Sequence, residues 1–135
     1  MNGALMRARV DAARVAHLAT VGADGRPHLV PVCPVRLDER VYHAVDHKPK
    51  RGPRLRRLAN IEATGHASLL VDAYDEDWTR LWWVRLDGTG RVVADPAEAS
   101  SAVTALIAKF PQYAARPPVG PVIAIDVRRW TGWSF

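Results

Sequence analysis

Residues 42–60 read YHAVDHKPKRGPRLRRLAN, and the rest of the chain can be interpreted outward from this stretch. Its apolar start predicts a short strand over residues 41–45, followed by a loop and a helix that begins near Pro53. Gly52 permits a tight turn, and proline is favoured at the first position of a helix. Between His47 and Arg57 there are six cations and no carboxylate: Lys48, Lys50, Arg51, Arg54, Arg56 and Arg57.

This cationic stretch, residues 47–57, predicts a site for an anion. The first turn of a helix has unpaired backbone N–H groups and the positive end of the helix dipole, and Lys and Arg side chains add full charges. Proteins commonly hold phosphate groups in this way. A basic run is also typical of a solvated helix face, so the pattern alone leaves both interpretations open.

The composition indicates a globular protein with an anionic partner. The chain has 135 residues, of which 48% are hydrophobic and 24% charged, as expected for one domain over residues 1–135. The formal net charge is +5. Without a zinc-finger, helix-turn-helix or RNA-recognition signature, we expect a phosphorylated cofactor rather than nucleic acid. No apolar run approaches the roughly 20 residues of a membrane span and no signal-peptide pattern is present, so we expect a cytoplasmic protein.

Hydrophobic periodicity predicts about six strands and two or three peripheral helices. We expect strands over residues 16–21, 27–37, 41–45, 66–71, 78–94 and 121–130, and helices over residues 6–15, 54–63 and 97–110. A turn at residues 22–25 joins the first two strands as a hairpin, and Thr64-Gly65 predicts the end of the second helix. The short turns favour antiparallel pairing, so the predicted fold is a small, mainly β barrel with helices at its edges.

Two strands contain residues that disturb regular pairing. Pro31 and Pro34 remove two donors from the strand over residues 27–37. That strand must therefore lie at an edge, carry a bulge, or turn free backbone groups toward a ligand such as a flat heterocycle. In the strand over residues 78–94, Asp87-Gly88 predicts either a hairpin turn or a bulge.

The side chains do not form a recognisable catalytic motif. GxSxG, HExxH, CxxC and P-loop patterns are all missing from the sequence, which favours chemistry supplied by a cofactor. Cys33 is interpreted as a small hydrophobic residue, and the acidic residues 72–77 lack the EF-hand pattern, so we predict no metal site. His28 and His47 are candidate donors to a ligand or ordinary polar residues. Trp78 is the most ligand-like tryptophan by position, with core or interface packing as the alternative.

A resemblance to a known family rests on four blocks: ARVAHLATVGADGRPHLVPV at residues 13–32, VYHAVDHKPKR with LRRLANI at 41–61, ASLLVDAYDEDWTRLWWVRLDG at 67–88, and PPVGPVIAIDVRRWTGWS at 117–134. In content and order they are similar to the actinobacterial, deazaflavin-dependent branch of the pyridoxamine 5'-phosphate oxidase-like, flavin-binding split-barrel superfamily. The first block is typical of the whole superfamily. The KPKR and DEDWTRLWWVRLDG segments indicate the branch.

The resemblance implies a six-stranded antiparallel split β-barrel that forms a homodimer, with the cofactor at the subunit interface. The implied cofactor is coenzyme F420, whose phosphate and oligoglutamate tail are anionic, with FMN as the alternative. The implied function is an oxidoreductase that transfers hydride between the deazaflavin and a small organic substrate. The alternatives are an FMN-dependent oxidoreductase and a protein that binds the cofactor without turnover. The resemblance also implies that Asp87-Gly88 is a bulge.

The resemblance further implies which residues contact the cofactor, and it assigns no catalytic residue. The strand backbone near His28, Val30, Pro31 and Val32 is expected to meet the flavin ring. The residues expected around the phosphate are Val45, Asp46, His47, Lys48, Lys50, Arg51, Arg54 and Arg57. Asn60 is expected to cap or order that loop, and Trp78 to reach the cofactor from the neighbouring subunit.

Overall fold

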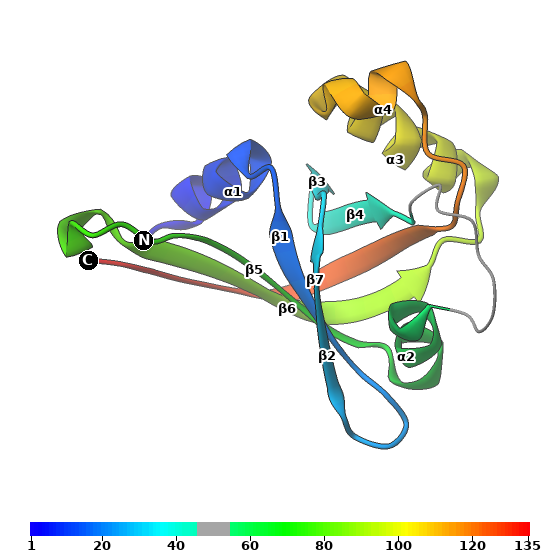
Figure 1. The fold of residues 1–135 in the computed structure, drawn as a ribbon, viewed down its shortest axis with the longest axis horizontal. Helices are drawn as coiled ribbons and strands as arrows, with labels where there is room; N and C mark the ends of the chain where they lie inside the picture. Colours follow the sequence, from blue (N-terminus) through cyan, green and yellow to red (C-terminus); the bar gives the residue numbers. More distant parts are fainter. Residues whose placement is uncertain (46–54) are drawn as a thin grey trace.

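The computed structural model describes residues 1–45 and 55–135, which form one antiparallel sheet of seven strands with helices around it (Figure 1). The strand order is β2-β1-β5-β6-β7-β4-β3. The strands are β1 (Ala16–Val21), β2 (Pro27–Val32), β3 (Val35–Leu37), β4 (Arg40–Ala44), β5 (His66–Ala73), β6 (Trp82–Val92) and β7 (Val122–Ser134). The helices are α1 (Gly3–Ala12), α2 (Arg56–Thr64), α3 (Pro96–Lys109) and α4 (Pro111–Ala115), with a 3-10 helix, η1 (Trp78–Arg80).

The two edge strands of the sheet are consecutive in the chain. Among the described residues β2 pairs with β1 alone and β3 with β4 alone, yet Cys33 and Pro34 are all that separate them. So short a link spans roughly 10 Å. The sheet must therefore curl until its two edges approach each other, which makes it an open, or split, barrel (Figure 1).

The prediction of one strand over residues 27–37 was wrong, and with it the count of six strands. The structure has two strands there, on opposite edges of the sheet, so the described residues form seven strands. Pro34 has no N–H to donate to a ladder, and the chain leaves one edge at Cys33 and joins the other at Val35. The expectation that Pro31 requires an edge strand, one of the three options, is confirmed.

Both faces of β4 are buried, because β4 separates two apolar clusters. Val41 and Val45 belong to the barrel interior. Tyr42 and Ala44 belong to a second cluster, packed against Leu106 and other residues of α3. A strand that is covered on both sides explains why residues 41–45 do not alternate between apolar and polar side chains.

The helix boundaries differ from the predictions at their N-termini. α1 begins at Gly3 rather than at residue 6, because the Asn2 side chain caps it by accepting a 2.8 Å hydrogen bond from the backbone N–H of Leu5. α2 begins at Arg56 rather than at residue 54, and Leu55 precedes it in an extended conformation. The predicted end of α2 is confirmed, since Gly65 has φ 71° and donates its N–H to Ile61 O at 2.9 Å.

Two other segments are more helical than predicted. Residues 78–80 form η1, so β6 begins at Trp82, and α4 occupies part of the proline-rich linker. Within the described residues, no helix has both the length and the apolar character needed to cross a bilayer.

β6 and β7 form the longest strand pair, and the predicted bulge lies within it. Their register shifts between Asp87 and Gly88, which confirms the bulge and excludes the hairpin turn. Gly88 lies so close to β7 that a Cβ atom would overlap the backbone carbonyl group of Asp126. Glycine at this position therefore permits the close approach of the two strands.

We expect Gly88→Ala to lower the free energy of unfolding by about 2–4 kcal/mol, because the backbone of β7 must move to admit the methyl group. Urea unfolding followed by tryptophan fluorescence measures the change. Gly3→Ala is the matched control, since its Cβ would meet only the end of the Arg7 side chain, at 3.0 Å. We expect the control to change stability by less than about 1 kcal/mol, and equal losses in both variants would contradict the close-approach explanation.

Candidate functional site

A seam between β2 and β4 leaves the barrel open. β3 pairs with β4 only as far as Tyr42, so in the described part of the chain His43 and Ala44 have strand partners on the β7 side alone. A cavity of about 260 Å³ lies at this seam, and we call it the seam cavity. Its lining residues are Val15, Pro31, Val32, Cys33, His43, Ala44, Arg57 and Tyr113.

Three of the residues expected from the sequence meet at the seam cavity. Pro31 and Val32 come from the end of β2, and Arg57 comes from the first turn of α2. These elements are far apart in sequence and belong to different layers of the fold (Figure 1). The structure therefore brings the edge of β2 and a cation together.

Six of the expected residues lie outside the described residues: Asp46, His47, Lys48, Lys50, Arg51 and Arg54. Val45, which directly precedes them, is 2% exposed, and its side chain belongs to the barrel core. Its backbone N–H donates to Pro121 O at 2.9 Å. The Val45 side chain and N–H therefore already take part in contacts within the fold, and neither is available to a ligand.

His28 and Val30 lie on the same strand face as Val32. Val30 pairs with Leu18 and packs partly against the barrel core. His28 pairs with Thr20, and its Nδ1 atom is buried without a hydrogen-bond partner in residues 1–45 and 55–135. Neither His28 nor Val30 lines the seam cavity, so in β2 a ligand there would meet Pro31, Val32 and the backbone edge of the strand.

Asn60 joins α2 to the β1–β2 hairpin. It is 3% exposed, and its Nδ2 donates to Thr20 Oγ1 at 3.1 Å. Its Oδ1 lies beneath the hairpin turn, where a Cβ on Gly22 would be only 2.9 Å away. These contacts hold the helix that carries Arg57, whereas the expected contact of Asn60 with the loop involves residues that the structure does not describe.

Trp78 lies far from the seam of its own chain. It begins η1, at the end of β5 and β6 that is remote from α2 (Figure 1). Its side chain is 69% exposed. Trp78 and Arg57 therefore do not share a site within one chain.

His43 is one of five residues of the seam cavity that the sequence analysis did not assign to a site, with Val15, Cys33, Ala44 and Tyr113. It is 3% exposed, and burial, followed by the nearby charge of Arg57, lowers its pKa to about 3. Its Nε2 atom has no hydrogen-bond partner among the described residues. An unsatisfied buried polar group costs about 1–3 kcal/mol. The available signal was its position between Val41 and Val45 at strand spacing, which predicts an inward-facing imidazole.

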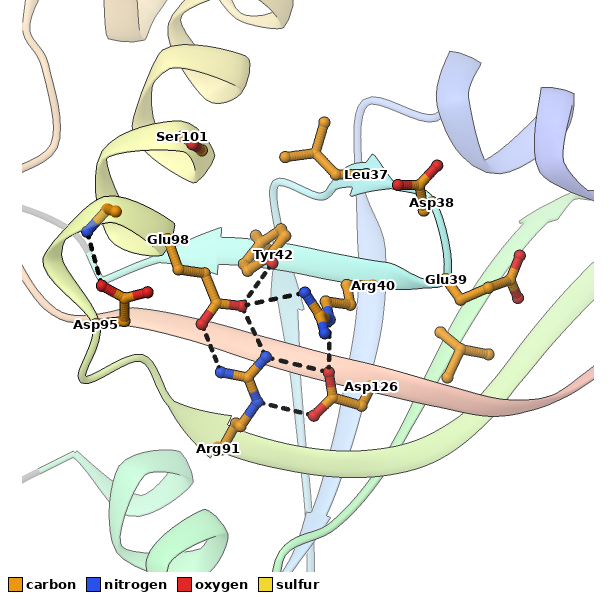
Figure 2. Close-up of a pocket in the computed structure, with 12 residues that line it drawn as sticks. Leu37, Asp38, Glu39, Arg40, Tyr42, Arg91, Asp95, Glu98, Ser101 and Asp126 are labelled. Carbon is orange, nitrogen blue, oxygen red and sulfur yellow. Dashed lines mark hydrogen bonds and ion pairs between the residues drawn. The ribbon is translucent and has the colours of Figure 1, made fainter.

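A larger hollow of about 1060 Å³ lies on the other side of β4, between α3 and the β3–β4 turn (Figure 2). Arg91 donates to both oxygens of Glu98 at 2.7 Å, and to the two oxygens of Asp126 at 2.7 and 3.1 Å. Tyr42 Oη donates to Glu98 Oε2 at 2.7 Å, and Arg40 Nε lies 3.2 Å from Asp126 Oδ1. The sequence analysis did not predict this network, because its members are spread over three strands and a helix.

The network is satisfied by its own members. The hydrogen bonds from Arg91 and then from Tyr42 lower the pKa of Glu98 to about 2, so its carboxylate is charged at neutral pH. The charged groups of the network, Arg40, Arg91, Glu98 and Asp126, each face an opposite charge (Figure 2). We interpret this hollow as the anchor of α3 on the sheet, and the seam cavity as the candidate ligand site.

Comparison with known families agrees with the fold. The model of the pyridoxamine 5'-phosphate oxidase family matches residues 4–134, almost the whole chain. The chain belongs to this family. No protein of curated function matches the sequence.

Solved structures with low sequence identity share the family's split-barrel fold. The conserved hypothetical protein Rv2991 of Mycobacterium tuberculosis superposes with a TM-score of 0.81 at 20% identity, over 99% of this chain and 85% of that one. A FAD-binding protein of Mesorhizobium loti gives 0.75 at 17% identity, over 98% and 94%. HutZ, the heme storage protein of Vibrio cholerae, gives 0.75 at 14% identity, over 98% and 93%. At these identities the comparison shows the fold alone.

The low pKa of His43 predicts a loss of stability in mild acid. His43 titrates near its ordinary value of 6.5 when unfolded and near 3 when folded, so between these values the unfolded state binds more protons. Stability therefore falls as the pH drops through this window. We expect the titration of His43 to lower the free energy of unfolding of the wild type by about 2 kcal/mol between pH 7 and pH 5. Urea unfolding at each pH measures this change.

His43→Leu should lack this part of the pH dependence, whereas His66→Leu, a change at an exposed position on β5, should keep it. An unchanged pH dependence in His43→Leu would show that His43 is not held neutral in the folded protein.

Proposed function

We propose that this member of the pyridoxamine 5'-phosphate oxidase family is a coenzyme F420-dependent oxidoreductase that acts as a homodimer. The main observation in support is that the end of β2 and Arg57 line the same seam cavity. Arg57 belongs to the cationic stretch of residues 47–57, which carries five further Lys and Arg residues. The four sequence blocks support the deazaflavin branch within the family.

The residues present fit a phosphorylated, ring-containing cofactor. The outer edge of β2 has no strand partner in the described part of the chain, so its backbone groups can bond to the polar edge of a heterocycle. Arg57 offers a charge to a phosphate. Ligand pockets usually measure about 300–1,000 Å³. The seam cavity, at about 260 Å³, can enclose only part of such a cofactor, which supports a site completed by other residues.

When bound, a reduced deazaflavin would supply a hydride to the substrate, and the substrate would take up one proton from solvent. The residues of this chain would bind and orient the cofactor. Arg57 would compensate the phosphate charge, the backbone edge of β2 would bond to the ring, and the apolar side chains of Val15 and Val32 would exclude water. The substrate class that suits this arrangement is a small, flat, electron-poor organic molecule able to stack on the ring.

Two alternatives have specific support. An FMN- or FAD-dependent oxidoreductase is supported by the structural similarity to the FAD-binding protein of Mesorhizobium loti. A protein that binds a cofactor without turnover is supported by the similarity to a heme storage protein. The tests below distinguish these from the proposed function.

Titration of the cofactor-free protein with oxidised coenzyme F420 and with FMN, followed by ligand fluorescence, tests the cofactor. We expect micromolar or tighter binding of F420 and at least about tenfold weaker binding of FMN. Arg57→Ala should weaken F420 binding by about 10- to 150-fold, as expected for a lost charge-assisted phosphate contact.

Arg56→Ala is the matched control for Arg57→Ala. Arg56 is exposed and adjacent on the same helix but does not line the seam cavity, so a much smaller effect is expected. A preference for FMN would favour the flavin alternative. If neither cofactor binds, the oxidoreductase proposal fails. Tight F420 binding without oxidation of its reduced form by quinones, tetrapyrroles or nitroaromatics would favour storage over catalysis.

The homodimer is proposed because one chain does not complete the site. Trp78 is exposed at the end of β5 and β6 remote from α2, and only a second copy could place it near a seam (Figure 1). Leu29 on the edge strand β2 is 67% exposed, which offers apolar surface to such a copy. We propose that each site combines Arg57 of one subunit with Trp78 of the other.

Mixing two variants that each bind F420 weakly tests the shared site. Trp78→Ala and Arg57→Ala should each bind F420 weakly as homodimers. After subunit exchange, mixed dimers contain one site with both wild-type residues, so tight binding should return at about a quarter of all sites. Sedimentation equilibrium of each variant confirms the dimer, and a mixture that regains no tight sites would contradict a shared site.

A further inference from the structure

His43 and Arg57 approach the seam cavity from different elements. His43 comes from β4 and Arg57 from α2, and both line the cavity. Val41 on β4 and Val45, directly after the strand, belong to the barrel core. An apolar side chain at position 43 would also pack between these two valines. Packing alone therefore does not explain an imidazole at this position.

The chemistry of His43 suits contact with a ligand better than it suits packing. Its side chain is 97% buried, and Nε2 has no hydrogen-bond partner within residues 1–45 and 55–135. A neutral imidazole carries one N–H donor and one acceptor. Buried polar atoms in native proteins are nearly always bonded to protein, water or ligand, so an unbonded atom of a residue that lines a cavity indicates an occupant.

The surroundings select the chemical class of that occupant. Arg57 gives the cavity a positive charge, whereas Val15, Pro31 and Val32 supply apolar walls. At about 260 Å³ the cavity can admit a phosphoryl group with its attached carbon atoms, but it cannot enclose a tricyclic ring. A guanidinium and a neutral N–H donor together match the oxygens of a phosphate ester.

We propose that His43 is a ligand-binding residue, which in its Nε2–H tautomer donates a hydrogen bond to a phosphoryl oxygen held beside Arg57. The identity of the ligand as a phosphorylated cofactor rests on the proposed function, but the phosphoryl subsite itself does not. His43 thereby adds a contact that carries no charge beside the cation Arg57.

The test compares phosphorylated and unphosphorylated ligands in two His43 variants. His43→Leu removes the nitrogen and keeps the volume, and His43→Gln keeps an N–H donor. We expect His43→Leu to weaken the binding of FMN and coenzyme F420 by about tenfold or more. The affinities for riboflavin and the phosphate-free deazaflavin riboside should change by less than about twofold. His43→Gln should recover part of the loss, and His66→Leu on β5 should bind as the wild type does.

A second measurement does not depend on the cofactor. Inorganic phosphate is added to the wild-type protein, and the ring nitrogens of its histidines are followed by long-range ¹H–¹⁵N correlation. We expect phosphate to move the His43 Nε2 resonance in the wild type and not in Arg57→Ala. The ligand-free His43→Leu variant should unfold cooperatively and be at least as stable as the wild type at pH 7, because it loses an unsatisfied polar atom.

The outcomes separate the subsite from the proposed function. If phosphate moves the His43 resonance while neither F420 nor FMN binds, the subsite stands and the proposed function fails. If F420 binds equally well to the wild type and His43→Leu, the subsite is wrong and the proposed function stands. Equal weakening of FMN and riboflavin would overturn the phosphoryl assignment. A marked loss of stability in ligand-free His43→Leu would show that Nε2 has a structural partner, which would also overturn it.

Discussion

Cys33 and Pro34 connect strands at opposite edges of a seven-stranded sheet, and this short link forces the sheet to curl. A flat sheet of this width would separate β2 from β3 by roughly 30 Å, since neighbouring strands lie about 4.8 Å apart. The curled sheet brings the edges together at the link but does not pair them. The seam and its cavity are the direct result of this geometry.

The same curl explains how β4 can be buried on both faces. One face turns into the barrel with Val41 and Val45, and the other is covered by α3. Side chains that alternate along β4 therefore enter two different environments. Tyr42 joins the network of Arg91, Glu98 and Asp126, whereas His43 faces the seam cavity. Neighbouring residues on one strand thus contribute to two polar sites with opposite character.

The two hollows differ in whether their polar groups satisfy one another. Around Arg91 every charge has an opposite charge within hydrogen-bond distance, and the network holds α3 on the sheet. At the seam cavity, the buried Nε2 atom of His43 has no hydrogen-bond partner in the described part of the chain. Size alone would select the larger hollow as the ligand site. Hydrogen-bond satisfaction selects the smaller one, because the buried His43 nitrogen there can gain a hydrogen bond from a ligand.

Local chemistry made several features predictable. The glycine at position 65 ends α2, the bulge lies at Asp87-Gly88, and Pro31 occupies an edge strand. Arg57, Pro31 and Val32 were implied as cofactor contacts only by the family resemblance, and the structure places all three at one cavity. For the glycine, the bulge and the edge proline the signal lies within a few residues, where backbone freedom and missing donors act directly. The division of residues 27–37 into two edge strands could not be read in this way, because it depends on where the curled sheet brings its edges. Nor could the inward position of His43 beside Arg57, or the network of Arg91 with Glu98 and Asp126, because contacts between distant segments arise only when the sheet closes on itself.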